Sequence, residues 1–87
     1  MRSPLEQNYP NPFNPATTIR FSLPQRSHVV LKVFDVHGRE VATLVDGNLV
    51  AGNHVVTFVP HRLPSGRYFY SLTAGKFKQT RKAVLVN

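Results

Sequence analysis

Few side chains in this chain of 87 residues could perform acid–base chemistry or bind a metal. They are four acids and four histidines: Glu6, Asp35, Glu40, Asp46, His28, His37, His54 and His61. The acids lie in the N-terminal tail or beside predicted turns, where no two form a pair for general acid–base catalysis. The histidines lack the HxH and HExxH spacings of zinc sites. Because cysteine is absent, a thiol nucleophile, a thiolate metal site and a disulfide are excluded. We therefore expect a non-catalytic domain without metal or cofactor.

Positive charge dominates the second half of the chain. The sequence holds 11 lysines and arginines against 4 acids, which gives a formal net charge of +7. No acid follows Asp46, but six basic residues do: Arg62, Arg67, Lys76, Lys78, Arg81 and Lys82. Such a field favours anionic partners such as lipid headgroups, acidic polysaccharide or nucleic acid. Alternatively, the lysines add solubility and protect an exposed strand edge from aggregation.

Alternating apolar and polar residues predict that short strands position these charges. Strands are expected over residues 17–23, 28–36, 40–45, 54–59, 67–73 and 76–86. No segment shows a helical period of about 3.6 residues. The pattern predicts an all-β fold, an Ig-like antiparallel β-sandwich of about seven strands with Greek-key connections.

The last predicted strand separates apolar from basic side chains. Successive side chains of a strand point to opposite faces of the sheet. One face carries Phe77, Ala83 and Leu85, which we expect in the core. The other face carries the lysines Lys76, Lys78 and Lys82. This strand therefore combines a core position with a cationic stripe.

Glycines and their neighbours predict the turns. Residues 35–38 read as a tight turn with Gly38 at a positive φ, and residues 46–48 (Asp-Gly-Asn) are expected to close the preceding strand. Gly66 precedes Tyr68 by two at the start of a strand, as in a tyrosine corner, where the phenol bonds to backbone a few residues upstream. An ordinary half-buried strand tyrosine is the alternative for Tyr68.

Residues 8–15 concentrate prolines and asparagines. They are Asn8, Tyr9, Pro10, Asn11, Pro12, Phe13, Asn14 and Pro15. The prolines restrict their own φ and the residue before them. A polyproline conformation would place the three asparagines on one face and leave Phe13 free to enter a core. The segment is a stiff linker or a ligand strip for a receptor, and the linker is favoured because proline-rich spacers are common. Residues 1–7 lack periodicity and are interpreted as a linker remnant, which leaves 8–87 as the domain.

The proline segment and the strand that follows it resemble a known family. Together with Thr17, Ile19, Phe21, Leu23 and Pro24, the segment is similar to the opening of the type A C-terminal sorting domain of the Bacteroidetes type IX secretion system. The resemblance continues nearly to the end, through residues 29–35, 38–44, 52–58, the Gly66-x-Tyr68-x-Tyr70-x-Leu72 motif and the final basic strand. Three departures are Phe58 for the usual tryptophan, Ala83 for a common methionine, and residues 59–62 for a polar turn.

The resemblance implies a secretion signal. Such domains end a cargo protein that has reached the periplasm, and the outer-membrane translocon recognises the folded module. A sortase-like cysteine peptidase cuts on its N-terminal side, and the cargo is released or attached to anionic lipopolysaccharide at the cell surface. Many cargoes are hydrolases, so the parent can be an enzyme although the module is not. The family signal lies in the last two strands, which maps recognition onto Gly66, Tyr68, Lys76, Lys78, Arg81, Lys82 and Leu85.

Other functions are compatible with the residues. An Ig-like accessory domain could bind carbohydrate or mediate adhesion through exposed tyrosines, although tryptophan is absent. Nucleic-acid binding is disfavoured because the aromatic residues alternate faces and are needed for the core. No apolar run approaches the roughly 20 residues of a membrane-spanning helix. No apolar h-region follows Met1, so we expect an upstream part of a longer chain to supply the export signal. The module is expected to be a monomer.

Overall fold

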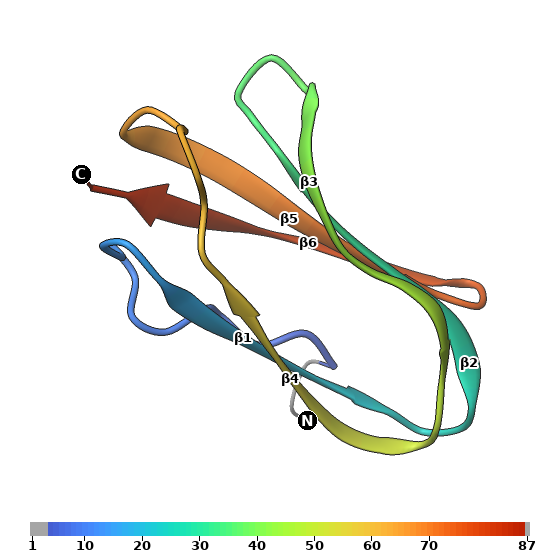
Figure 1. Cartoon of the computed structure of the whole chain (residues 1–87). Coiled ribbons are helices and arrows are strands. Elements are labelled where there is room, and N and C mark those ends of the chain that lie inside the picture. The colour runs from blue at the N-terminus through green and yellow to red at the C-terminus, as the bar shows by residue number, and fades with distance from the viewer. Residues whose placement is uncertain (1–3, 87) are drawn as a thin grey trace.

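The computed structural model describes residues 4–86, and in that range the chain forms six β-strands and no helix. They are β1 (Thr17–Leu23), β2 (Ser27–Phe34), β3 (Glu40–Leu49), β4 (Gly52–Phe58), β5 (Gly66–Ala74) and β6 (Phe77–Leu85). β1 and β4 form one antiparallel sheet, and the second sheet has the order β3-β2-β5-β6. Figure 1 shows the two sheets facing each other as two layers. The predicted all-β antiparallel sandwich is confirmed, with six strands instead of about seven.

The core follows the alternation of the strands. In β1 the side chains of Ile19, Phe21 and Leu23 are buried, while Arg20 between them is exposed. This period of two buries one face of each strand and leaves the other to solvent. The remaining buried apolar residues are Leu5, Phe13, Val29, Leu31, Val33, Phe58, Tyr68, Tyr70, Leu72, Ala83 and Leu85. Two of these, Leu5 and Phe13, come from the segment before β1.

β3 is longer than the sequence predicts. Asp46, Gly47 and Asn48 were expected to form a turn, but they continue β3 and pair with β2 as far as its first residue. Gly47 is not one of the glycines with a positive φ, which are Gly38, Gly52, Gly66 and Gly75. The expected turn is therefore wrong, because β2 offers unpaired backbone along its whole length and β3 satisfies it. His28 of β2 contacts Asp46 at 3.1 Å across this extension.

Phe77 is a second correction. Its parity matches that of Ala83 and Leu85, as expected, yet its side chain is 37% exposed while theirs are buried. Phe77 pairs with Ala74 beside the turn at Gly75, which has φ of 60°. The hairpin tip extends past the centre of the sandwich, so a residue there faces inward without a core to enter.

Residues 4–13, which we call the strap, begin along β1. The backbone N–H of Ser22 donates to the Pro4 carbonyl, and that of Glu6 donates to the Arg20 carbonyl, both at 2.9 Å. Tyr9 and Thr18 then exchange two backbone hydrogen bonds of 2.9 Å. The strap therefore satisfies the edge of β1 that lies opposite to β4, and it is visible in Figure 1 as the blue segment beside β1.

The strap then crosses to the other sheet. Phe13 donates its N–H to the Val84 carbonyl and accepts the N–H of Val86, both at 2.9 Å. Asn11 accepts the N–H of Val84 through its side-chain oxygen at 2.9 Å. One short segment thus joins the edge of β1 to the edge of β6 and closes one side of the sandwich.

These contacts change the interpretation of the N-terminal segment. The expectation that residues 8–15 act as a stiff linker is wrong, because Phe13 is 1% exposed and both of its backbone groups bond to β6. The expectation that Phe13 enters the core is confirmed. The asparagines do not share one face, since Asn8 is buried while Asn11 and Asn14 are exposed. Residues 4–7, assigned to a linker remnant, lie along β1 and include the fully buried Leu5; residues 1–3 lie outside the described range.

If the strap belongs to the core, substitutions within it should differ sharply. Phe13→Ala removes a buried ring whose centroid lies 6.0 Å from that of Phe58. It should lower the free energy of unfolding by about 3–5 kcal/mol. Tyr9→Ala alters a side chain that is 75% exposed, and it should cost about 0.5 kcal/mol or less. Urea unfolding of both variants measures the difference, and small equal losses would contradict a structural role for the strap.

Candidate functional site

β6 carries unpaired positive charge on its outward face. Lys78 and Lys82 are exposed there, and Lys76 is exposed in the preceding turn. Within residues 4–86, none of the three forms an ion pair, whereas Lys32 of β2 contacts Glu40 at 3.0 Å. The second sheet thus neutralises charge near β3 and leaves it free at β6, where no acid follows in the sequence.

The side chain of Arg81 lies on the opposite face of the sheet from these lysines. It lies opposite Tyr70 on the inward side of the sheet. Its Nε donates to the carbonyl of Leu5 at 2.6 Å, and the neighbouring Gln79 accepts the Leu5 N–H at 3.3 Å. Arg81 therefore holds the strap, a role that could not be predicted from local pattern because Leu5 lies 76 residues away in the chain.

Tyr70 completes the attachment of the strap. Its hydroxyl donates to the Glu6 carbonyl at 2.8 Å and accepts the N–H of Asn8 at 2.7 Å. The side-chain amide of Asn8 in turn donates to the hydroxyl of Thr17 at 2.9 Å and to the Pro10 carbonyl at 3.1 Å. Buried polar groups left without partners are costly, and among the described residues every buried side-chain nitrogen and oxygen has one.

Gly66 and Tyr68 build the predicted tyrosine corner. The Tyr68 hydroxyl donates to the Pro64 carbonyl at 2.6 Å, four residues upstream, which confirms the corner. Gly66 begins β5 with φ of 152°, a conformation that a side chain would strain. In register, Gly66 lies opposite Leu85 and Tyr68 opposite Ala83.

The residues assigned to recognition thus fall into three groups. Gly66, Tyr68 and Leu85 hold the loop and the core at one end of the β5–β6 pair. Arg81 holds the strap. The lysines at 76, 78 and 82 are the members of the set that face solvent with free charge. The structure therefore brings the lysines together on one strand and its turn, and places the others elsewhere.

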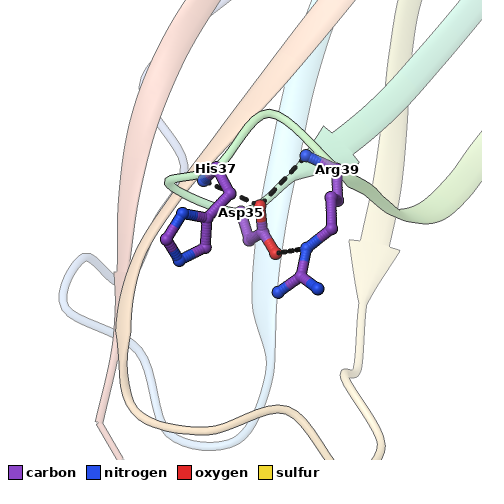
Figure 2. Close-up of polar contacts among 3 residues, drawn as sticks. All are labelled: Asp35, His37 and Arg39. Atoms are coloured by element: carbon purple, nitrogen blue, oxygen red, sulfur yellow. Dashed lines mark hydrogen bonds and ion pairs between the residues drawn. The ribbon is translucent and has the colours of Figure 1, made fainter.

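Asp35 has a role that the sequence analysis missed. As Figure 2 shows, its carboxylate spans the β2–β3 turn and accepts the N–H groups of His37 and Arg39 at 2.9 and 3.0 Å. The Arg39 Nε donates to the second oxygen at 2.9 Å. The hydrogen bond from the Arg39 backbone is the largest of the effects that hold the pKa of Asp35 below its ordinary 3.8. The positive φ predicted for Gly38 is confirmed, at 80°. The sequence signal for the role of Asp35 was an aspartate at the first position of a turn.

Metal ligands and membrane-spanning helices bear on other functions. Residues 4–86 contain no group of three or more histidine, cysteine or acidic side chains that could hold a metal ion. In the same range, no helix has the length and apolar character needed to cross a membrane.

The described residues thus form a small β-sandwich that is closed by its own N-terminal segment and exposes a basic last strand. Residues 7–87 match the family model described as the secretion system C-terminal sorting domain, and the chain belongs to this family. Searches of curated proteins and of solved structures returned no match. The predicted resemblance is confirmed. As a type IX sorting domain, the module interacts with the type IX secretion machinery and marks its protein for export to the cell surface or extracellular space.

The different roles of Arg81 and the lysines should appear as different effects on the free energy of unfolding. Arg81→Gln removes the charged donor to the Leu5 carbonyl, and it should lower the free energy of unfolding by about 1–2 kcal/mol. Lys82→Gln removes a charge without a partner, so the change should stay within about 0.5 kcal/mol. Equal effects of the two substitutions in urea unfolding would show that Arg81 does not anchor the strap.

The ionisation of Tyr70 should make the free energy of unfolding change with pH in the alkaline range. Burial raises its pKa from 10.0 to about 12, against the opposing effects of the Asn8 N–H and the Arg81 charge. Because the pKa is higher in the folded state, this contribution is complete below pH 10 and is lost as pH rises toward 12. Unfolding free energies measured from pH 9 to 12 should fall more steeply for the wild type than for Tyr70→Phe. Parallel curves would contradict the assignment.

Proposed function

We propose that the module is a non-catalytic secretion signal and cell-surface attachment module, and that the translocon contacts it through Lys76, Lys78 and Lys82. The observation that carries this proposal is the free positive charge on the outward face of β6. A stripe of one sign attracts and orients an anionic partner before contact is made.

The folding of β6 supports recognition of the complete module. Ala83 and Leu85 of this strand are buried in the core, and the strap bonds to its edge. The spacing of the lysines therefore depends on the folded sandwich. Recognition of a folded surface would let the machinery distinguish a folded sorting module from an unfolded one.

The same arrangement supports a proposal for processing and attachment. We infer that a sortase-like cysteine peptidase cuts on the N-terminal side of Pro4, because a peptidase needs an extended accessible segment and residues 4–13 are bonded to two strands. The cargo, often a hydrolase in this family, is then released or attached to anionic lipopolysaccharide. The lysines offer that surface an electrostatic contact in the uncut module.

The accessory-domain alternative has less support. Carbohydrate binding by stacking would need neighbouring exposed aromatic side chains. Among residues 4–86, the exposed tyrosine and phenylalanine side chains are Tyr9, in the strap, and Phe77, at the β5–β6 hairpin. Adhesion and carbohydrate binding remain predictions without a specific observation that favours them.

Export of a reporter tests the proposal. The reporter carries a periplasmic export signal at its start and the complete chain of 87 residues at its end, and it is expressed in a host with type IX secretion. Lys76→Gln, Lys78→Gln and Lys82→Gln combined should lower the extracellular fraction about tenfold and leave the reporter in the periplasm.

The matched control removes three exposed basic residues outside β6, namely Arg20→Gln, Arg26→Gln and Arg62→Gln. It has the same net charge and should be exported normally. Normal export of the lysine variant, or equal loss in both, would refute a specific role for the β6 lysines.

A further inference from the structure

The backbone of β6 alternates between its neighbour β5 and the outer edge of the sheet. The carbonyl of Lys82, the N–H and carbonyl of Val84, and the N–H of Val86 all bond to the strap. These even-numbered residues therefore face the edge. β5 and β6 pair without a register shift, so the alternation of an antiparallel ladder makes Lys78 and Thr80 face the edge as well.

The strap covers only part of this edge. Through Gln7, Asn11 and Phe13 it occupies the Lys82 carbonyl, both backbone groups of Val84 and the Val86 N–H. Among residues 4–86, none bonds to the edge-facing backbone groups of Lys78 and Thr80. A short stretch of strand between the hairpin and the strap thus presents donors and acceptors to solvent.

We propose that this stretch is an interaction surface for an acidic, extended segment of a protein partner, which adds to the edge of β6 at Lys78 and Thr80. The proposal rests on the proposed function and specifies how the translocon partner would bind. Strand addition supplies main-chain hydrogen bonds, and the side chains that flank them select the sequence.

The charges around the open stretch select an acidic partner. Lys76 and Lys78 lie on one side of Thr80 and Lys82 lies on the other, each without an ion pair within the described residues. A basic segment would be repelled, whereas carboxylates on alternate positions of an added strand would face the lysines. The pairing must be short, because the strap blocks extension beyond Lys82.

An apolar hollow beside the β5–β6 hairpin would accept the side chains at the other alternate positions of the added strand. It has a volume of about 450 Å³, and Pro4, Leu72, Ala74 and Phe77 are among the residues that line it. Phe77, which is 37% exposed at the hairpin, would be covered by an apolar side chain of the partner. The segment that fits is therefore one that alternates acidic with apolar residues.

A proline substitution can close the open stretch without removing charge. Thr80 is exposed and its N–H faces the edge, so Thr80→Pro removes an edge donor but no hydrogen bond to β5. The control is Asn48→Pro in β3. The direction of the backbone N–H groups alternates along each strand and can be followed from β6 through β5 and β2 to β3. Asn48, which lies opposite His28, therefore also has its N–H at an outer edge of the sheet.

Export of the same reporter decides between the outcomes. Thr80→Pro should lower the extracellular fraction about tenfold, while Asn48→Pro is exported like the wild type. Export of Thr80→Pro at the wild-type level, or an equal loss in both variants, overturns strand addition. If Thr80→Pro is exported while the triple lysine variant is not, the proposed function stands and this inference fails. If the wild-type fusion itself stays in the periplasm, the proposed function fails.

Amide hydrogen exchange tests the surface without a substitution. The probe is a blocked peptide of six residues that alternates aspartate with valine, added to the complete chain. It should slow exchange at Thr80 about tenfold and leave Val86, already bonded to Phe13, unchanged. A peptide that alternates lysine with valine should have no effect. Unchanged exchange at Thr80 with the acidic peptide, or equal slowing by both peptides, counts against the proposal.

Discussion

The edges of β1 and β6 would each leave backbone donors and acceptors unpaired, and the strap bonds to the edge of β1 and to the end of β6 from Lys82 to Val86. Its first half bonds to β1 and its second half to β6, while Leu5 and Phe13 enter the core between the sheets. A sandwich this small buries a limited apolar area, so two further large side chains matter for its stability. The tyrosine, glutamine and arginine that bind the strap all come from β5 and β6, which links both ends of the chain.

The basic residues of β6 divide by chemistry as well as by direction. A guanidinium offers directed donors, and that of Arg81 reaches a carbonyl on the inner side. A lysine ammonium is strongly hydrated, and the lysines at 78 and 82 remain in solvent. Free charge on a strand edge also discourages aggregation. The same stripe therefore protects the strand edge and is the surface through which we propose that an anionic partner binds, while the strap limits how much backbone such a partner could reach.

Much of the fold was predictable because its pattern is local. The alternation in β1 and β2, the turn at Gly38 and the corner at Tyr68 each depend on residues close in sequence, and all agree with the structure. The extension of β3 was missed because an Asp-Gly-Asn run is typical of turns, and only pairing with β2 overrides that preference. Phe77 was misplaced because parity predicts the direction of a side chain but not whether a core lies there.

The sequence by itself determined the layered all-β fold, the family, the absence of thiol chemistry and the basic last strand, because composition and local periodicity carry these properties. Only the tertiary structure decided that the proline segment is part of the core, that Arg81 binds the strap, and that the strap leaves the edge of β6 open beside Lys78 and Thr80 among the described residues. The physical reason is distance along the chain: Leu5 and Arg81 are 76 residues apart, and only folding brings them together.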